Sequence, residues 1–135
     1  MKYPELWNRF IDEVYDPYFA KENKPFSNEQ KYASIALAYD GAVNNGGHIC
    51  FFDGFGDVFS IDEVAEALRV TVGIEFSMNF LSAAAHIHYT DDYGYMPDEE
   101  SDSDPIEDNI FYEMTPALPD LLEIYIFNNK EKIFQ

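Results

Sequence analysis

The sequence lacks basic residues over nearly half of its length. No lysine or arginine occurs between Arg69 and Lys130, although thirteen carboxylates fall there. A buried carboxylate without a partner is costly or becomes protonated, so we expect most of these groups to face water or a cationic partner. The net charge of −18 over 135 residues also argues against binding to nucleic acid or an anionic membrane, because like charges repel across a Debye length of about 8 Å.

Other features are scarce as well. Cys50 is the single cysteine, so no disulfide can form within the chain. No run of eighteen apolar residues occurs, and charged residues interrupt the first twenty, which excludes a spanning helix and a signal-peptide core. We therefore expect a soluble, cytoplasmic protein.

The motifs of common enzyme classes are also missing. The chain contains no G-x-x-x-x-G-K-[ST] phosphate loop, no H-E-x-x-H zinc motif and no G-x-S-x-G nucleophile elbow. Paired carboxylates are too numerous in so acidic a sequence to indicate catalysis. We predict a protein that is not an enzyme and has no cofactor.

Apolar residues are abundant and regularly spaced. They make up 47% of the chain, and 17% of residues are aromatic, which is enough for one folded domain over residues 1–135. The dominant spacing is three and four residues, which is typical of helices. We predict a single compact all-α domain of about six helices, over residues 6–19, 27–44, 60–72, 74–88, 104–114 and 119–134.

Local signals set several of these boundaries. Pro17 should end or kink the first helix near Asp16. Ser27 with Gln30, and Ser60 with Glu63, have the spacing of capping boxes at two helix starts.

A turn is expected at Asn44, Asn45, Gly46 and Gly47, because these residues tolerate positive φ angles. The apolar run from His48 to Phe52 follows at once. Its periodicity fits a helical turn or a minor short strand equally well.

A long acidic loop is expected at about residues 89–108, where Gly94, Pro97 and Pro105 interrupt any period. Its carboxylates are our candidate partner-binding residues. They are Asp91, Asp92, Asp98, Glu99, Glu100, Asp102, Asp104, Glu107 and Asp108.

Metal binding is not expected. The run from Asp98 to Asp104 is rich in oxygen ligands, but it lacks the glycine and distal glutamate of a calcium loop. His86 and His88 point in different directions on a helix. They could share a zinc ion with His48 and Cys50 only if the fold brought both pairs together, and packing roles are the simpler interpretation.

The segment from Tyr39 to Phe52, YDGAVNNGGHICFF, resembles the signature of a bacterial DNA-mimic-protein-like family whose members mostly lack an assigned role. The similarity covers about residues 30–128. It departs from the usual pattern at Asp53, where the family commonly has asparagine, and in the acidic loop. The resemblance implies a mostly helical fold and, for the member that named the family, occupation of the DNA-binding surface of a transcription factor.

These observations favour a non-catalytic acidic module that binds a basic protein. The partner would be a DNA-binding regulator if the protein is a DNA mimic. An immunity-type inhibitor of a basic toxin or nuclease would use the same electrostatic attraction. A structural domain is a third possibility, in which the charge would serve only solubility. The sequence also leaves a homodimer open.

Overall fold

The computed structural model describes the backbone of residues 1–92 and 105–135, and the side chains of residues 1–87 and 105–135. Every regular element in this part of the chain is a helix, so the all-α prediction is confirmed. The short strand that was left open at His48–Phe52 does not form, because these residues continue a helix after a kink. None of the described helices is long and apolar enough to cross a bilayer.

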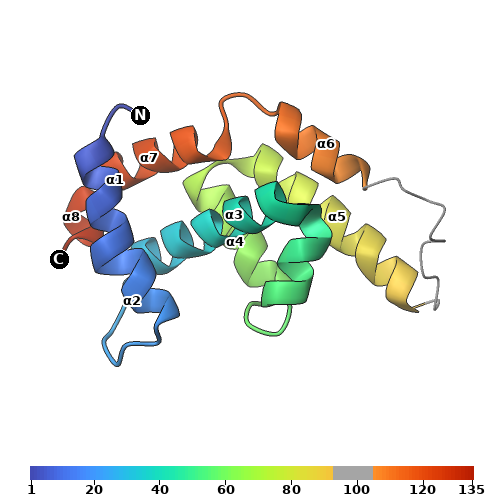
Figure 1. Cartoon of the computed structure of the whole chain (residues 1–135), viewed down its shortest axis with the longest axis horizontal. Helices are drawn as coiled ribbons and strands as arrows, with labels where there is room; N and C mark the ends of the chain where they lie inside the picture. The colour runs from blue at the N-terminus through green and yellow to red at the C-terminus, as the bar shows by residue number, and fades with distance from the viewer. Residues whose placement is uncertain (93–104) are drawn as a thin grey trace.

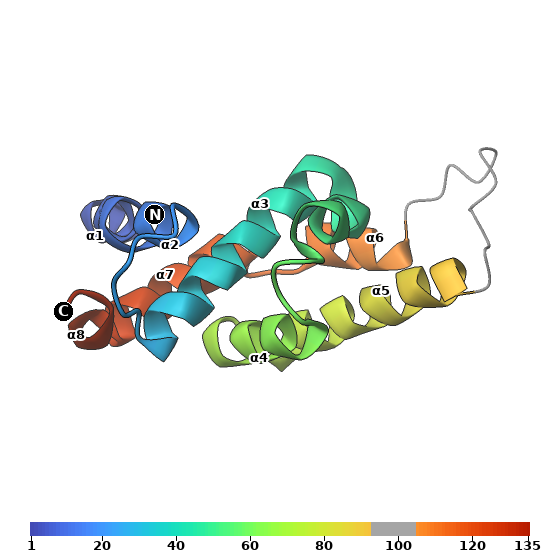
Figure 2. The same cartoon turned by 90° about the horizontal axis from the view of Figure 1, so that it is seen from below.

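The helices surround one long central element (Figures 1 and 2). Helix α3 contacts α4, α5, α6, α7 and α8, and its Tyr39 ring is completely buried. That ring meets Phe51, Phe80 and Phe111 edge-on at centroid distances of 5.4–5.6 Å. Such contacts between the edge and face of aromatic rings stabilise a core beyond the burial of area alone. The elements are α1 (Pro4–Phe10), a π-helical turn (Ile11–Tyr15), α2 (Asp16–Phe19), α3 (Asn28–Phe55), α4 (Ile61–Thr71), α5 (Ile74–Asp92), α6 (Ile106–Glu113), α7 (Leu118–Asn128) and α8 (Lys130–Ile133).

Of the two alternatives predicted for Pro17, a stop near Asp16 is wrong, whereas an irregularity does interrupt the α-helix directly before Asp16. The segment passes through the π-helical turn and continues to Phe19. Pro17 has no N–H to donate to the carbonyl four residues earlier, which belongs to Glu13. Lys24 Nζ donates to that carbonyl instead, at 3.4 Å, so the loop after α2 supplies the missing donor.

The predicted helix starts carry their caps. Ser27 and Gln30 form the reciprocal capping box at α3, and Ser60 Oγ accepts from Glu63 N at the start of α4. The last helix is broken at Asn129, which separates α7 from α8. Ser27 Oγ and Gln30 Nε2 donate to the carbonyls of Lys132 and Ile133, which fixes α8 against the start of α3.

Candidate functional site

Two features of the structure bear on function: a buried polar network at the kink of α3, and the distribution of charge over the surface. The kink lies at Gly46 and Gly47, within the segment where a turn was expected. Gly47 has φ +79°, and a Cβ atom there would lie 2.4 Å from Oδ2 of Asp108. The glycine is therefore needed both for its backbone angle and for its lack of a side chain.

The kink directs His48 towards α6. The backbone N–H of His48 donates to Oδ1 of Asp108 at 2.9 Å, and Nδ1 lies 2.5 Å from the same oxygen. On the other side of the ring, Nε2 lies 2.6 Å from the Tyr39 hydroxyl. Burial lowers the pKa of His48 despite the nearby carboxylate, so the ring is neutral, with Nδ1–H donating to Asp108 and Nε2 accepting from Tyr39. All three side chains are buried.

This arrangement has the order of a catalytic triad but no access for a substrate. Burial raises the pKa of Tyr39, with further contributions from Asp108 and Asp40, so its hydroxyl keeps its proton. A nucleophile must be able to reach a reacting atom, and the Tyr39 ring is 0% exposed. The network therefore joins α6 to α3 and does not form an active site.

Glu107 makes a second set of contacts between α6 and α5. Its carbonyl accepts from Asn79 Nδ2 at 2.9 Å and its Oε1 accepts from Ser82 Oγ at 2.9 Å. His86 Nδ1 lies 4.0 Å from the same Oε1. Oε2 is buried and has no hydrogen-bond partner among the described residues.

These contacts overturn two of the predicted partner-binding residues. Glu107 and Asp108 are only 4% and 2% exposed, so they cannot belong to an outward-facing patch. The cost of burying Asp108 is offset by two donors from His48. Sequence reasoning missed this role because the donors lie 60 residues away and become available only when the glycine kink forms.

The other predicted partner-binding residues are not described to the same extent. Asp91 and Asp92 lie on the last turn of α5, so they belong to a helix and not to the loop, but their side chains lie outside the described part. The rest of the set, Asp98, Glu99, Glu100, Asp102 and Asp104, lies entirely outside the described residues, and so does the run considered for calcium.

Charge is segregated along the molecule. Between Tyr32 and Asn129 the sequence has nineteen of its 26 acids and only one of its eight basic residues, Arg69. Arg69 is already paired with Glu66, with Nη2 2.6 Å from Oε1. The other basic residues belong to segments that gather at one end of the molecule in Figure 1, namely the N-terminal residues with α1, the loop after α2, the first turn of α3 and α8. They are Lys2, Arg9, Lys21, Lys24, Lys31, Lys130 and Lys132.

Four exposed carboxylates away from this end of the molecule were not among the predicted partner-binding residues. Asp53, Asp57, Asp62 and Glu63 are all exposed where α3 passes into α4. We call these four residues the α3–α4 acidic group. Asp53 lies in the last turn of α3, Asp57 in the turn that follows, and Asp62 and Glu63 in the first turn of α4. The last two were a usable sequence signal, since acids are favoured at a helix N-terminus.

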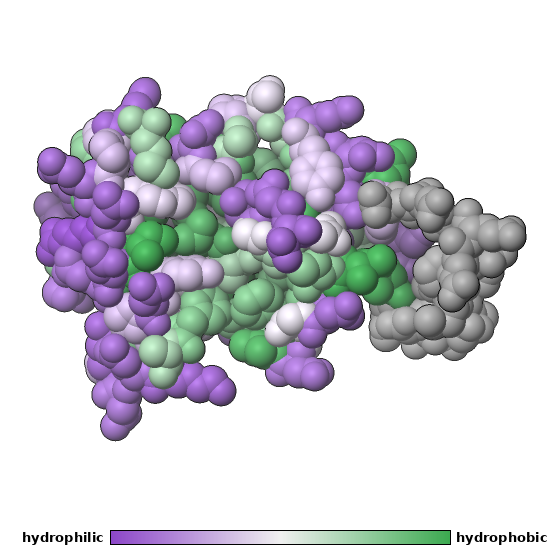
Figure 3. All heavy atoms as spheres, viewed as in Figure 1, coloured by the Kyte–Doolittle hydropathy of each residue, from purple (hydrophilic) through white to green (hydrophobic). Residues whose placement is uncertain are grey.

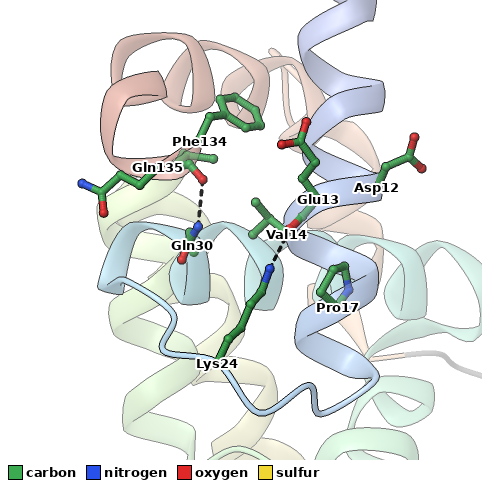
Figure 4. A pocket seen from close by; sticks show the side chains of 9 residues that line it. Asp12, Glu13, Val14, Pro17, Lys24, Gln30, Phe134 and Gln135 are labelled. Carbon is green, nitrogen blue, oxygen red and sulfur yellow. Dashed lines mark hydrogen bonds between the residues drawn. The ribbon is translucent and has the colours of Figure 1, made fainter.

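The described surface has a pocket of about 530 Å³ between the N-terminal residues with α1 and the end of α7, where Lys2, Arg9 and Lys130 are among the lining residues. A cavity of about 270 Å³ lies between α2, α3 and the C-terminus, and Figure 4 shows that Lys24 and Gln30, which line it, are engaged with the carbonyls of Glu13 and Ile133. In Figure 3 this end of the molecule is dominated by hydrophilic side chains, whereas hydrophobic ones gather towards the middle of the face. Among the described residues, no three His, Cys, Asp or Glu side chains are grouped to hold a metal ion.

Comparison with known protein families gives a match to the family described as DMP19-like protein, over residues 24–129. DMP19 stands for DNA mimic protein 19, so the resemblance noted in the sequence is confirmed. No curated protein and no solved structure matches the chain. Because the family match covers well over half of the 135 residues, the protein belongs to the DMP19-like protein family.

Proposed function

We propose that this protein is a non-catalytic acidic module that occupies the basic DNA-binding surface of a transcription factor or another nucleic-acid-binding protein in the cytoplasm. The observation that carries the proposal is membership of a DNA-mimic family. The charge segregation supports it, because one arginine among nineteen acids leaves most of the molecule without competing cations.

The electrostatics of the exchange are favourable. Duplex DNA presents one negative charge per roughly 1.7 Å of its axis, and its binding proteins meet that array with lysine and arginine. Carboxylates held on a helical scaffold can accept charge-assisted hydrogen bonds from the same groups. The α3–α4 acidic group presents four such carboxylates within eleven residues of chain. The acids from Asp91 to Asp104 remain a prediction for the same interface.

Affinity capture tests the proposal. The protein is immobilised, exposed to lysate of its source organism at low salt, and washed either with a duplex oligonucleotide or with an uncharged polymer. We expect a DNA-binding protein that the oligonucleotide releases and the polymer does not. A captured nuclease or toxin whose activity is blocked would point to an immunity-type inhibitor, and retention of no basic protein would refute the proposal.

A further inference from the structure

Helix α5 is apolar on two sides. Phe76, Phe80 and Ala83 face the core, with exposures of 4% or less. Ile74, Met78 and Leu81 lie on the outer side, with exposures of 55%, 62% and 40%. We call these three residues the α5 stripe. Their spacing of four and three residues places them on one face of the helix.

The outer side of α5 carries no other described element. Figure 2 shows α4 and α5 along the lower side of the molecule, with α3 and α6 above them. Single exposed apolar residues are normal on a protein surface, but a continuous row is typical of an interaction site. Val70, at the end of α4 and 37% exposed, precedes the row.

The charge around the α5 stripe indicates the charge of the partner that would bind there. The N-terminal end of the α5 stripe is next to Glu75, and the neighbouring α4 begins with Asp62 and Glu63, all exposed. No lysine occurs on α4, α5, α6 or α7, and Arg69 is held by Glu66 through both Nε and Nη2. A partner that exposes lysine or arginine would therefore be attracted to this surface.

We propose that the α5 stripe binds the apolar side of a basic amphipathic helix in the partner. Such a helix carries two or three large apolar residues at helical spacing, which pack on the stripe, and lysine or arginine beside them, which face the surrounding carboxylates. The long, flexible side chain of Met78 can adapt its conformation to the surface of the partner helix. The inference rests on the proposed function and adds the apolar part of its interface.

Two labelled synthetic peptides of equal length and equal lysine content serve as probes. One has leucines at helical spacing and the other has alanines in their place. We expect the protein to bind the leucine peptide more tightly, and the double variant Met78→Gln, Leu81→Gln to raise Kd for that peptide about tenfold. The same variant should change Kd for the alanine peptide by less than about twofold, since its charge is unaltered. Ile124→Gln, at an exposed residue of α7, is the matched control and should change neither value.

Methyl-labelled methionine gives an independent reading by NMR. The resonance of Met78 should shift on addition of the leucine peptide, while that of Met114, which packs against the core, should not. Circular dichroism of the double variant must match that of the unaltered protein.

Three results would overturn the inference. Equal binding of the two peptides, or equal losses in the double variant and in Ile124→Gln, would remove the stripe from the interface and leave the acidic proposal standing. A dimer that the double variant dissociates, without any effect of the stripe on peptide binding, would place a second copy there. Failure of both peptides to bind at low salt would count against the proposed function itself.

Discussion

Gly47 sits where the backbone of α3 changes direction and where the carboxylate of Asp108 approaches most closely. We expect Gly47→Ala to lower the free energy of unfolding by roughly 2 kcal/mol or more, because φ is +79° and the new Cβ would meet Asp108. Gly41→Ala is the matched control. It lies in the same helix with nothing within 4 Å of the new atom, and should raise stability by about 0.5–1 kcal/mol. Urea unfolding of both variants measures the difference, and equal effects would show that the kink does not constrain residue 47.

Asp40 provides a prediction about pH. Burial raises the pKa of Asp40 from 3.8 to about 6. Between these two pH values the folded state holds a proton that the unfolded state has released. The contribution of Asp40 to stability is therefore full below the unfolded pKa and is lost as pH rises to about 6. Asp40→Asn should raise the free energy of unfolding by about 1–3 kcal/mol at pH 7.5 and by much less at pH 4. Urea titrations at the two pH values check this, and a gain that is the same at both would contradict the assignment.

At the scale of single residues, the sequence predicted the turn at the glycine pair but not the contact with Asp108 that the turn makes possible. The signal of Asn44 to Gly47 was a tolerance for positive φ, which is a local property. That His48 would then point two N–H groups at Asp108 depends on where α6 lies, and no local pattern contains that information.

Among the elements, α6 depends most on buried polar contacts. It is short, with eight residues, and is joined to α3 through Asp108 and to α5 through Glu107. We expect Asp108→Ala to lower the free energy of unfolding by roughly 3 kcal/mol, because two buried donors of His48 lose their acceptor. Hydrogen exchange should speed up at the amide of His48 and throughout α6.

Glu113→Ala is the control for this prediction, since it removes an exposed carboxylate from the same helix. It should change stability by less than about 0.5 kcal/mol. Similar losses in the two variants would mean that α6 is held by its apolar contacts alone.

Helices were predicted well where a capping residue came directly before apolar residues at helical spacing. Ser27 and Ser60 lie at helix starts as expected, because a cap is a local contact. Tertiary context decided two alternatives that the sequence left open. The run His48–Phe52 is helical and packs Phe51 into the core. The first helical segment becomes irregular before Pro17 but does not end there, and Lys24 supplies a donor to the carbonyl of Glu13.

For the molecule as a whole, the distribution of charge follows from chain order and packing together. The basic residues lie near both termini, and the contacts of α1 with α7 and of α3 with α8 bring those termini to one end. Sequence reasoning identified the stretch without cations but placed two of its acids, Glu107 and Asp108, on the surface. It erred because buried carboxylates with distant partners look the same in sequence as solvated ones.

The central claim is that the acids away from the end that holds α1 and α8 substitute for DNA. Its most direct test is the displacement of labelled duplex DNA from the captured DNA-binding partner, followed by fluorescence anisotropy. The test variant replaces the α3–α4 acidic group with amides (Asp53→Asn, Asp57→Asn, Asp62→Asn and Glu63→Gln). The control variant makes an equal change of charge at exposed acids near the end that holds α1 and α8 (Glu5→Gln, Asp12→Asn, Asp16→Asn and Glu22→Gln). We predict that the unaltered protein displaces the DNA, that the test variant needs at least about tenfold more protein, and that the control stays within about twofold. Failure of the unaltered protein to displace DNA, or equal losses in the two variants, would contradict the account.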